Sequence, residues 1–127
     1  MFTHVMVGCN DKGASLAFYD ATFGTLGIEG MRHDRGAFYR SEDGSMFGVV
    51  SPANGEAATY ANGGTIGLAA TSKDQVDAWH AAGLANGGTD EGAPGPRDYT
   101  DAPMYGAYLR DPCGNKLCLY VFGEAAA

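Results

Sequence analysis

The chain has 127 residues, of which 45% are hydrophobic and 18% charged, and its formal net charge is −7. This length predicts one domain that needs neither a disulfide nor a metal merely to fold. The acidic balance disfavours a nucleic-acid partner, because the eight basic residues form no cluster that could neutralise phosphates. We find no signal peptide, no apolar run of membrane-spanning length and an odd number of cysteines. We therefore expect no membrane partner and a cytoplasmic location with reduced thiols.

The first half of the chain predicts a strand, a helix and three further strands. Residues 2–8 alternate in polarity, which indicates a strand with His4 and Met6 on one face. Asn10 or Asp11 can cap the helix that follows, and glycines end it. Three short strands are expected next, at 31–33, 37–40 and 46–50.

A connector rich in Pro, Gly, Ala and Asn, 51–63, separates this half from a second one. A strand at 65–70 leads into a helix with a capping box, in which Gln75 follows Ser72 by three residues. The Asn-Gly-Gly sequence at 86–88 ends that helix.

The last third of the chain predicts a hairpin. A short strand at 89–92 precedes a proline-rich loop, 93–103. The turn at 111–115 has Asp in the first position and Pro in the second, which is typical of a type I turn. It joins two strands, 104–110 and 116–122. Residues 124–127 are expected to be frayed.

The two halves match each other at a spacing of 61 positions. His4 plus 61 is Thr65, and Phe18 plus 61 is Trp79. Few residues are identical, but the predicted strand, the helix cap, the helix and the glycine that ends it occur at equivalent positions in the two halves. The sequence therefore predicts an α+β domain, residues 1–127, built from two tandem βαβββ modules. Their approximate ranges are 1–55 and 62–123.

Two segments of the chain carry a resemblance to a known family. Their matching residues are His4-Val5-Met6-Val7, Ser15, Phe18-Tyr19, Leu26-Gly27 and Asp111-Pro112-Cys113-Gly114-Asn115. Together they resemble the vicinal oxygen chelate superfamily, which includes glyoxalase I, bleomycin-resistance proteins and extradiol dioxygenases. The resemblance implies a curled mixed sheet around a small-molecule cavity, usually in a homodimer.

The resemblance also implies metal-ligand positions on the first and last strands of each module. In this chain these positions fall at His4, Phe47 (with Val49 as the neighbouring option), Thr65 and Cys118. Only His4 is a good ligand, and the Cys118 thiolate would have no carboxylate or second histidine beside it. A catalytic divalent site usually needs about three protein ligands. We therefore expect no cofactor, with His4 and Cys118 as the ligands to consider if a divalent metal is found.

Each of the remaining candidate residues has a functional interpretation and a purely structural one. His4 is either a general acid or base or a satisfied polar residue of the cavity wall. Arg97, in the proline-rich loop, either holds an anionic group of a ligand or belongs to a solvated connector. Cys118 is either a nucleophile paired with His4 or a small buried hydrophobe. The aromatic residues that could line a pocket or pack in the core are Tyr39, Phe47, Tyr105 and Tyr108, and alternation lets only some face inward. The predicted ligand-binding set is Phe47, Thr65, Arg97, Tyr105 and Cys118.

Two functions remain open on the sequence. The first is a glyoxalase-like lyase or isomerase that acts on a small polar molecule and uses His4. The second is a non-catalytic protein that binds and sequesters a small molecule, as the bleomycin-resistance branch does. Because most metal ligands are missing, the sequence favours sequestration over any reaction that needs a metal. Because His4 is retained, the lyase or isomerase function stays open. Nothing in the sequence singles out a third possibility, a structural or regulatory protein that binds a partner.

Overall fold

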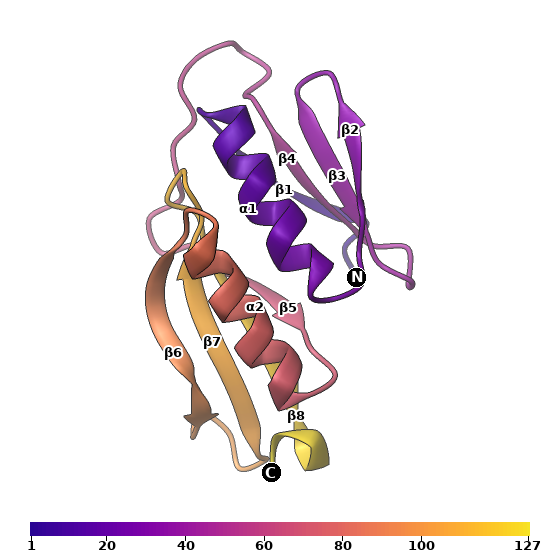
Figure 1. Ribbon diagram of the computed structural model, residues 1–127, viewed down its shortest axis with the longest axis vertical. Helices are drawn as coiled ribbons and strands as arrows, with labels where there is room; N and C mark the ends of the chain where they lie inside the picture. Colours follow the sequence, from indigo (N-terminus) through magenta and orange to yellow (C-terminus); the bar gives the residue numbers. More distant parts are fainter.

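The computed structural model describes residues 1–127, and its first half forms a four-stranded sheet with one helix (Figure 1). The strands lie in the order β1-β4-β3-β2, with β1 parallel to β4 and the other pairs antiparallel. Asp11 caps the helix, because its carboxylate accepts a hydrogen bond from the backbone N of Ala14. The elements are β1 (His4–Gly8), α1 (Lys12–Gly24), β2 (Gly30–His33), β3 (Gly36–Arg40) and β4 (Met46–Val50).

The second half repeats this arrangement. Its strands lie in the order β5-β8-β7-β6, with β5 parallel to β8. The Ser72 side chain caps α2, and α2 is α1 displaced by 61 positions, since Lys12 plus 61 is Lys73. The predicted α+β fold of two tandem βαβββ modules is therefore confirmed. The elements are β5 (Ile66–Ala69), α2 (Lys73–Ala85), β6 (Thr89–Arg97), β7 (Met104–Arg110) and β8 (Lys116–Phe122).

The two modules pack through their helices. In Figure 1, α1 and α2 lie next to each other, and each covers one face of its own sheet. No strand of one sheet is hydrogen-bonded to the other sheet. Each sheet therefore has a helix-side face, which contributes to one shared core, and a helix-free face. In β1, Val5 and Val7 point to the helix side, and His4 and Met6 to the helix-free side.

At one end, buried polar groups join the two modules. The Tyr19 hydroxyl, from α1, donates a 2.6 Å hydrogen bond to Asp111 Oδ2 in the turn between β7 and β8. The Asn115 side-chain amide in the same turn donates to the backbone oxygen of Gly8 at 3.1 Å. Because Asp111 and Asn115 are both buried, these bonds fix the second module's hairpin against the first module.

The structure corrects two predictions. Strand β6 continues through Arg97, into the segment predicted as a loop. Its register shifts between Gly92 and Gly95, and it tolerates Pro94 and Pro96 because it is an edge strand with no neighbour on one side. The C-terminal residues predicted to fray instead form a short 3₁₀ helix, η1 (Gly123–Ala126), in which Ala126 is buried. None of the helices has the length and apolar character that crossing a membrane requires.

Candidate ligand-binding site

Two predicted residues lie on the helix-free faces of different sheets. His4 on β1 is exposed, and its Nδ1 lies 2.8 Å from the hydroxyl of Thr3. Cys118 on β8 is buried, and this burial raises the pKa of its thiol. Thr65 is exposed just before β5. Because His4 and Cys118 belong to sheets that do not pair within one chain, the single chain does not assemble them into a catalytic pair.

Phe47 and Tyr105 lie on the opposite, helix-side faces. Phe47 is buried in the core, and the Tyr105 hydroxyl donates to Asp77 of α2 at 2.7 Å. Gly48, one residue further along β4, faces the helix-free side and pairs with Met6. Phe47 and Tyr105 of the predicted ligand-binding set therefore face the opposite way from Cys118, because a shift of one residue along a strand reverses the face.

The chain does not present a metal site of the kind that the family resemblance raised. No three His, Cys, Asp or Glu side chains lie together in a group that could hold a metal ion. His4 has only a neighbouring hydroxyl beside it, and Cys118 is enclosed among Met104, Tyr108 and Tyr120. The residues of one chain therefore do not fit a divalent metal, and we derive no step through one.

The helix-free face of the second sheet carries an aromatic surface that we call the aromatic platform, formed by Tyr108, Tyr120 and Phe122. The Tyr120 hydroxyl donates to the Tyr108 hydroxyl at 3.0 Å, and the Tyr120 ring stacks on Phe122 at a centroid distance of 5.7 Å. Two glycines make room for these rings. A Cβ on Gly106 would collide with the Tyr120 ring, and one on Gly92 would crowd Tyr108. The rings can therefore approach the backbone of the sheet closely.

Two cations flank the platform. Lys116 Nζ lies 5.3 Å from the centroid of the Tyr108 ring, and Arg97 Cζ lies 6.0 Å from it. The Arg97 guanidinium donates to the backbone oxygens of Ala93 and Gly95, which holds it in place. Neither cation pairs with a carboxylate. The platform is therefore positively charged although the chain as a whole is acidic.

The sequence contained a signal for part of this platform. Tyr108 was among the candidate aromatic residues, and it lies directly opposite Cys118 in the hairpin. Tyr120 was missed, although it shares a face with Cys118 because it lies two residues further along β8. Counting positions in the hairpin from Cys118 identifies both Tyr108 and Tyr120 as residues of its face, whereas Tyr105 lies on the other face.

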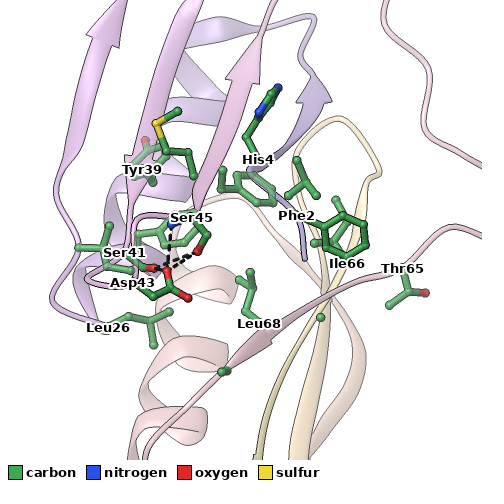
Figure 2. A pocket seen from close by; sticks show the side chains of 17 residues that line it. Phe2, His4, Leu26, Tyr39, Ser41, Asp43, Ser45, Thr65, Ile66 and Leu68 are labelled. Atoms are coloured by element: carbon green, nitrogen blue, oxygen red, sulfur yellow. Dashed lines mark hydrogen bonds between the residues drawn. The ribbon is translucent and has the colours of Figure 1, made fainter.

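A separate cavity of about 450 Å³ opens between the two modules, lined by residues of α1, β1, β3, β4 and β5 (Figure 2). His4, Phe47 and Thr65 of the predicted set are among its lining residues. Figure 2 shows the His4 ring directed away from Asp43, which lies across the cavity in the turn between β3 and β4. The cavity and the aromatic platform are therefore different surfaces. His4, Phe47 and Thr65 line the cavity, Arg97 and Cys118 adjoin the platform, and Tyr105 belongs to neither.

Comparison with known proteins places this geometry in a family. The model of the Glyoxalase/Bleomycin resistance protein/Dioxygenase superfamily matches residues 1–119. The chain is 54% identical to a glyoxalase/bleomycin resistance protein from Albidiferax ferrireducens, with a TM-score of 0.89 over 94% of this chain and 97% of that one. No curated protein sequence matches the chain significantly.

More distant structures share the fold alone. One is a glyoxalase/bleomycin resistance protein/dioxygenase family enzyme from Burkholderia phytofirmans, at 21% identity and a TM-score of 0.69 over 93% of this chain and 95% of that one. Another is a lactoylglutathione lyase from Agrobacterium tumefaciens, at 24% identity and a TM-score of 0.66 over 94% and 92%. From the match over residues 1–119 together with the paired βαβββ modules, the chain belongs to the glyoxalase/bleomycin resistance protein/dioxygenase superfamily.

Proposed function

We propose that this protein binds a small, planar, polar molecule against the aromatic platform and that it acts by binding rather than by catalysis. One observation carries the proposal. Two cations, Arg97 and Lys116, lie close to the Tyr108 ring and have no carboxylate partner. The Tyr120 ring is stacked on Phe122 and meets the Tyr108 ring edge-on. Aromatic rings arranged in this way favour a ligand with an aromatic ring, and unpaired cations favour a negative group on it. We place this activity in the cytoplasm.

We also propose that a homodimer completes the site. Strands β1 and β5 each have one edge without a neighbouring strand, and open edges tend to pair. If β1 of one copy lies beside β5 of another, the His4 face of the first copy and the Cys118 face of the second enclose one cavity. Light scattering at micromolar concentration should therefore give the mass of two chains, and a monomeric mass would refute this part of the proposal.

A substitution on β1 tests the pairing itself. Thr3 and Cys9 form their backbone hydrogen bonds with β4, so the N–H groups at even positions such as Met6 point to the open edge. Met6→Pro removes one edge donor without removing a bond to β4, whereas Met6→Ala keeps that donor. We expect Met6→Pro to dissociate the dimer and Met6→Ala to leave it intact. Equal dimerisation of the two variants would contradict pairing through β1.

Calorimetric titration with 1-naphthoate, a planar aromatic anion, tests the ligand site. We expect Lys116→Ala and Arg97→Ala each to weaken binding by about fivefold, as for the loss of one partly exposed ion pair. Lys12→Ala removes the same charge at the start of α1, where Lys12 only donates to the backbone oxygen of Asp34, and serves as the control. Absence of 1-naphthoate binding, or equal loss in all three variants, would refute the platform as the site.

His4 supports a second candidate, the lyase or isomerase function. Its ring is exposed, and only Thr3 lies within hydrogen-bond distance of it. An enzyme of this kind would convert a thiol adduct of a 2-oxoaldehyde, and His4→Gln would abolish turnover while keeping the fold. Elemental analysis of the purified protein separates this candidate from pure binding. Metal-free protein without turnover excludes it, whereas a stoichiometric metal that is lost in His4→Gln would overturn the binding proposal.

A further inference from the structure

We infer that the cavity between the two modules is a second binding site, suited to a small organic ammonium ion with an apolar body. This site lies between the two modules and is lined by residues of α1, β1, β3, β4 and β5, whereas the aromatic platform lies on the helix-free side of the second sheet. The inference uses residues other than those of the platform, although the cavity is also lined by β1 and β5, the strands that the proposed homodimer pairs. It rests on the walls of the cavity, on the single carboxylate in it, and on a difference between the two hairpin turns.

The walls of the cavity are apolar and come from both modules. Phe23, Tyr39 and Phe47 of the first module are buried behind it, and Ile66 and Leu68 of β5 face them from the second module. A volume of about 450 Å³ lies within the range of small-molecule sites. An apolar molecule of one or two rings would remove these side chains from water, which is favourable.

One carboxylate provides the polar end of the cavity. Asp43 is the only Asp, Glu, Lys or Arg side chain in its lining. Asp43 Oδ1 accepts hydrogen bonds from the Ser41 hydroxyl, from the Ser45 hydroxyl at 2.6 Å and from the Ser45 backbone N at 2.9 Å. These bonds, with that from Ser41 the largest cause, lower the pKa of Asp43 to about 2, so the carboxylate is charged at neutral pH.

The other oxygen of this carboxylate is free. None of the hydrogen bonds to Asp43 goes to Oδ2. Leu26 and Leu68 line the same cavity as this carboxylate (Figure 2). An ammonium group can therefore donate to Oδ2 while its apolar body packs against Leu26, Leu68 and the nearby aromatic rings, whose faces also attract cations. An anion of the same shape would be repelled.

The two hairpin turns differ in how they meet the module interface. The turn at 111–115 crosses to the other module, where Asp111 accepts from Tyr19 and Asn115 donates to Gly8. The corresponding turn at 41–45 forms its hydrogen bonds within itself. The turn at 111–115 therefore closes one end of the module interface, whereas the turn at 41–45 has no hydrogen bond to the other module and contributes its carboxylate to the cavity lining.

Calorimetric titration with three probes of the same shape tests the site: 1-naphthylmethylammonium, neutral 1-naphthylmethanol and 1-naphthoate. We expect Asp43→Asn to weaken binding of the ammonium probe by about fivefold and to leave binding of the alcohol unchanged. Asp34→Asn, which removes the same charge from the turn between β2 and β3, is the control. Leu68→Trp fills the cavity and should abolish binding of both the ammonium and the alcohol probe. Circular dichroism and thermal unfolding establish that each variant is folded.

The outcomes separate this site from the aromatic platform. Lys116→Ala should weaken binding of 1-naphthoate and leave binding of the ammonium probe unchanged. Asp43→Asn should weaken binding of the ammonium probe and leave binding of 1-naphthoate unchanged. Loss of 1-naphthoate binding alone would count against the proposed function and not against this site. The cavity site is refuted if the ammonium probe does not bind, if Asp43→Asn binds it as tightly as the unaltered protein, or if folded Leu68→Trp still binds it. If a second copy of the chain fills the cavity, the ammonium probe will not bind, and the cavity site is refuted.

Discussion

The hydroxyl of Tyr19 and the carboxylate of Asp111 are 92 positions apart in the sequence but form a 2.6 Å hydrogen bond across the module interface. Both side chains are buried, and Asn115 also donates to the same Asp111 oxygen at 2.8 Å. Burial, followed by the charge of Asp111 and the hydrogen bond to it, raises the pKa of Tyr19 well above its usual value. The phenol therefore remains a donor throughout the neutral pH range.

Tyr19→Phe should lower the free energy of unfolding by about 2 kcal/mol, because it removes a hydrogen bond to a buried charged group. Denaturant unfolding followed by circular dichroism measures this change. Tyr39→Phe is the matched control. Its ring is equally buried, but its hydroxyl donates to Asp20, which is exposed and keeps its salt bridge with Arg32. Equal losses in the two variants would show that the bond to Asp111 has no special role.

The stability of the protein should fall as the pH rises above about 10. Burial is the first cause of the raised pKa of Tyr19, Tyr39 and Tyr120. Each phenol therefore loses its proton in the unfolded chain before it does so in the folded chain. The unfolded state then binds fewer protons, so the free energy of unfolding decreases with pH in this window and is unaffected by these groups below it.

Urea unfolding at about pH 8 and about pH 11 measures this dependence. In Tyr120→Phe one of the three phenols is missing, and the loss of stability between the two pH values should be smaller. An unchanged difference in that variant would contradict a contribution from Tyr120.

Gly106→Ala should destabilise the protein by about 1–3 kcal/mol, because the added methyl group collides with the Tyr120 ring. It should also weaken 1-naphthoate binding, since Tyr120 must move out of the platform. Gly24→Ala is the control, because nothing lies within 4 Å of the added Cβ at the end of α1. That change should be neutral or stabilise the helix by up to about 1 kcal/mol. If thermal unfolding shows Gly106→Ala to be more stable than Gly24→Ala, the close packing of Tyr120 against Gly106 is disproved.

The three thiols should react with iodoacetamide in the order of their exposure. Cys113, in the turn between β7 and β8, is half-buried, whereas Cys9 and Cys118 are buried. Burial is the first cause of a raised pKa in all three, so each should react slowly at neutral pH. Mass spectrometry of the alkylated peptides should find Cys113 modified first. Faster modification of Cys118 would indicate an activated thiol and revive the nucleophile hypothesis.

The repeat and its boundaries could be predicted from the sequence because their signals are local. Asp11 and Ser72 precede their helices at equivalent positions, and both act as caps in the structure. The hairpin turn at 111–115 was equally clear from its Asp-Pro start. Such signals depend on a few neighbouring residues, whose backbone preferences act before any tertiary contact forms.

The side of the sheet on which a residue lies was harder to predict. Phe47 was matched to the last strand with an error of one position, since Gly48 is the residue that corresponds to Cys118 on the helix-free face. Alternation along a strand predicts two faces but does not say which face the helix covers. The cavity was not predictable from such patterns, because it depends on how Leu68 of one module and Phe23 of the other are placed by module packing.

The unequal turns have a consequence for how this protein can evolve. Substitutions at 111–115 disturb the bonds of Asp111 and Asn115 to the other module, so selection for folding restricts them. The turn at 41–45 bonds only within itself, so Asp43 and its neighbours can be exchanged at little cost to the fold. After a duplication of the βαβββ unit, one hairpin can thus preserve the architecture while the other diversifies in ligand preference. Relatives of this chain should accordingly differ most in their first hairpin turn and least in their second.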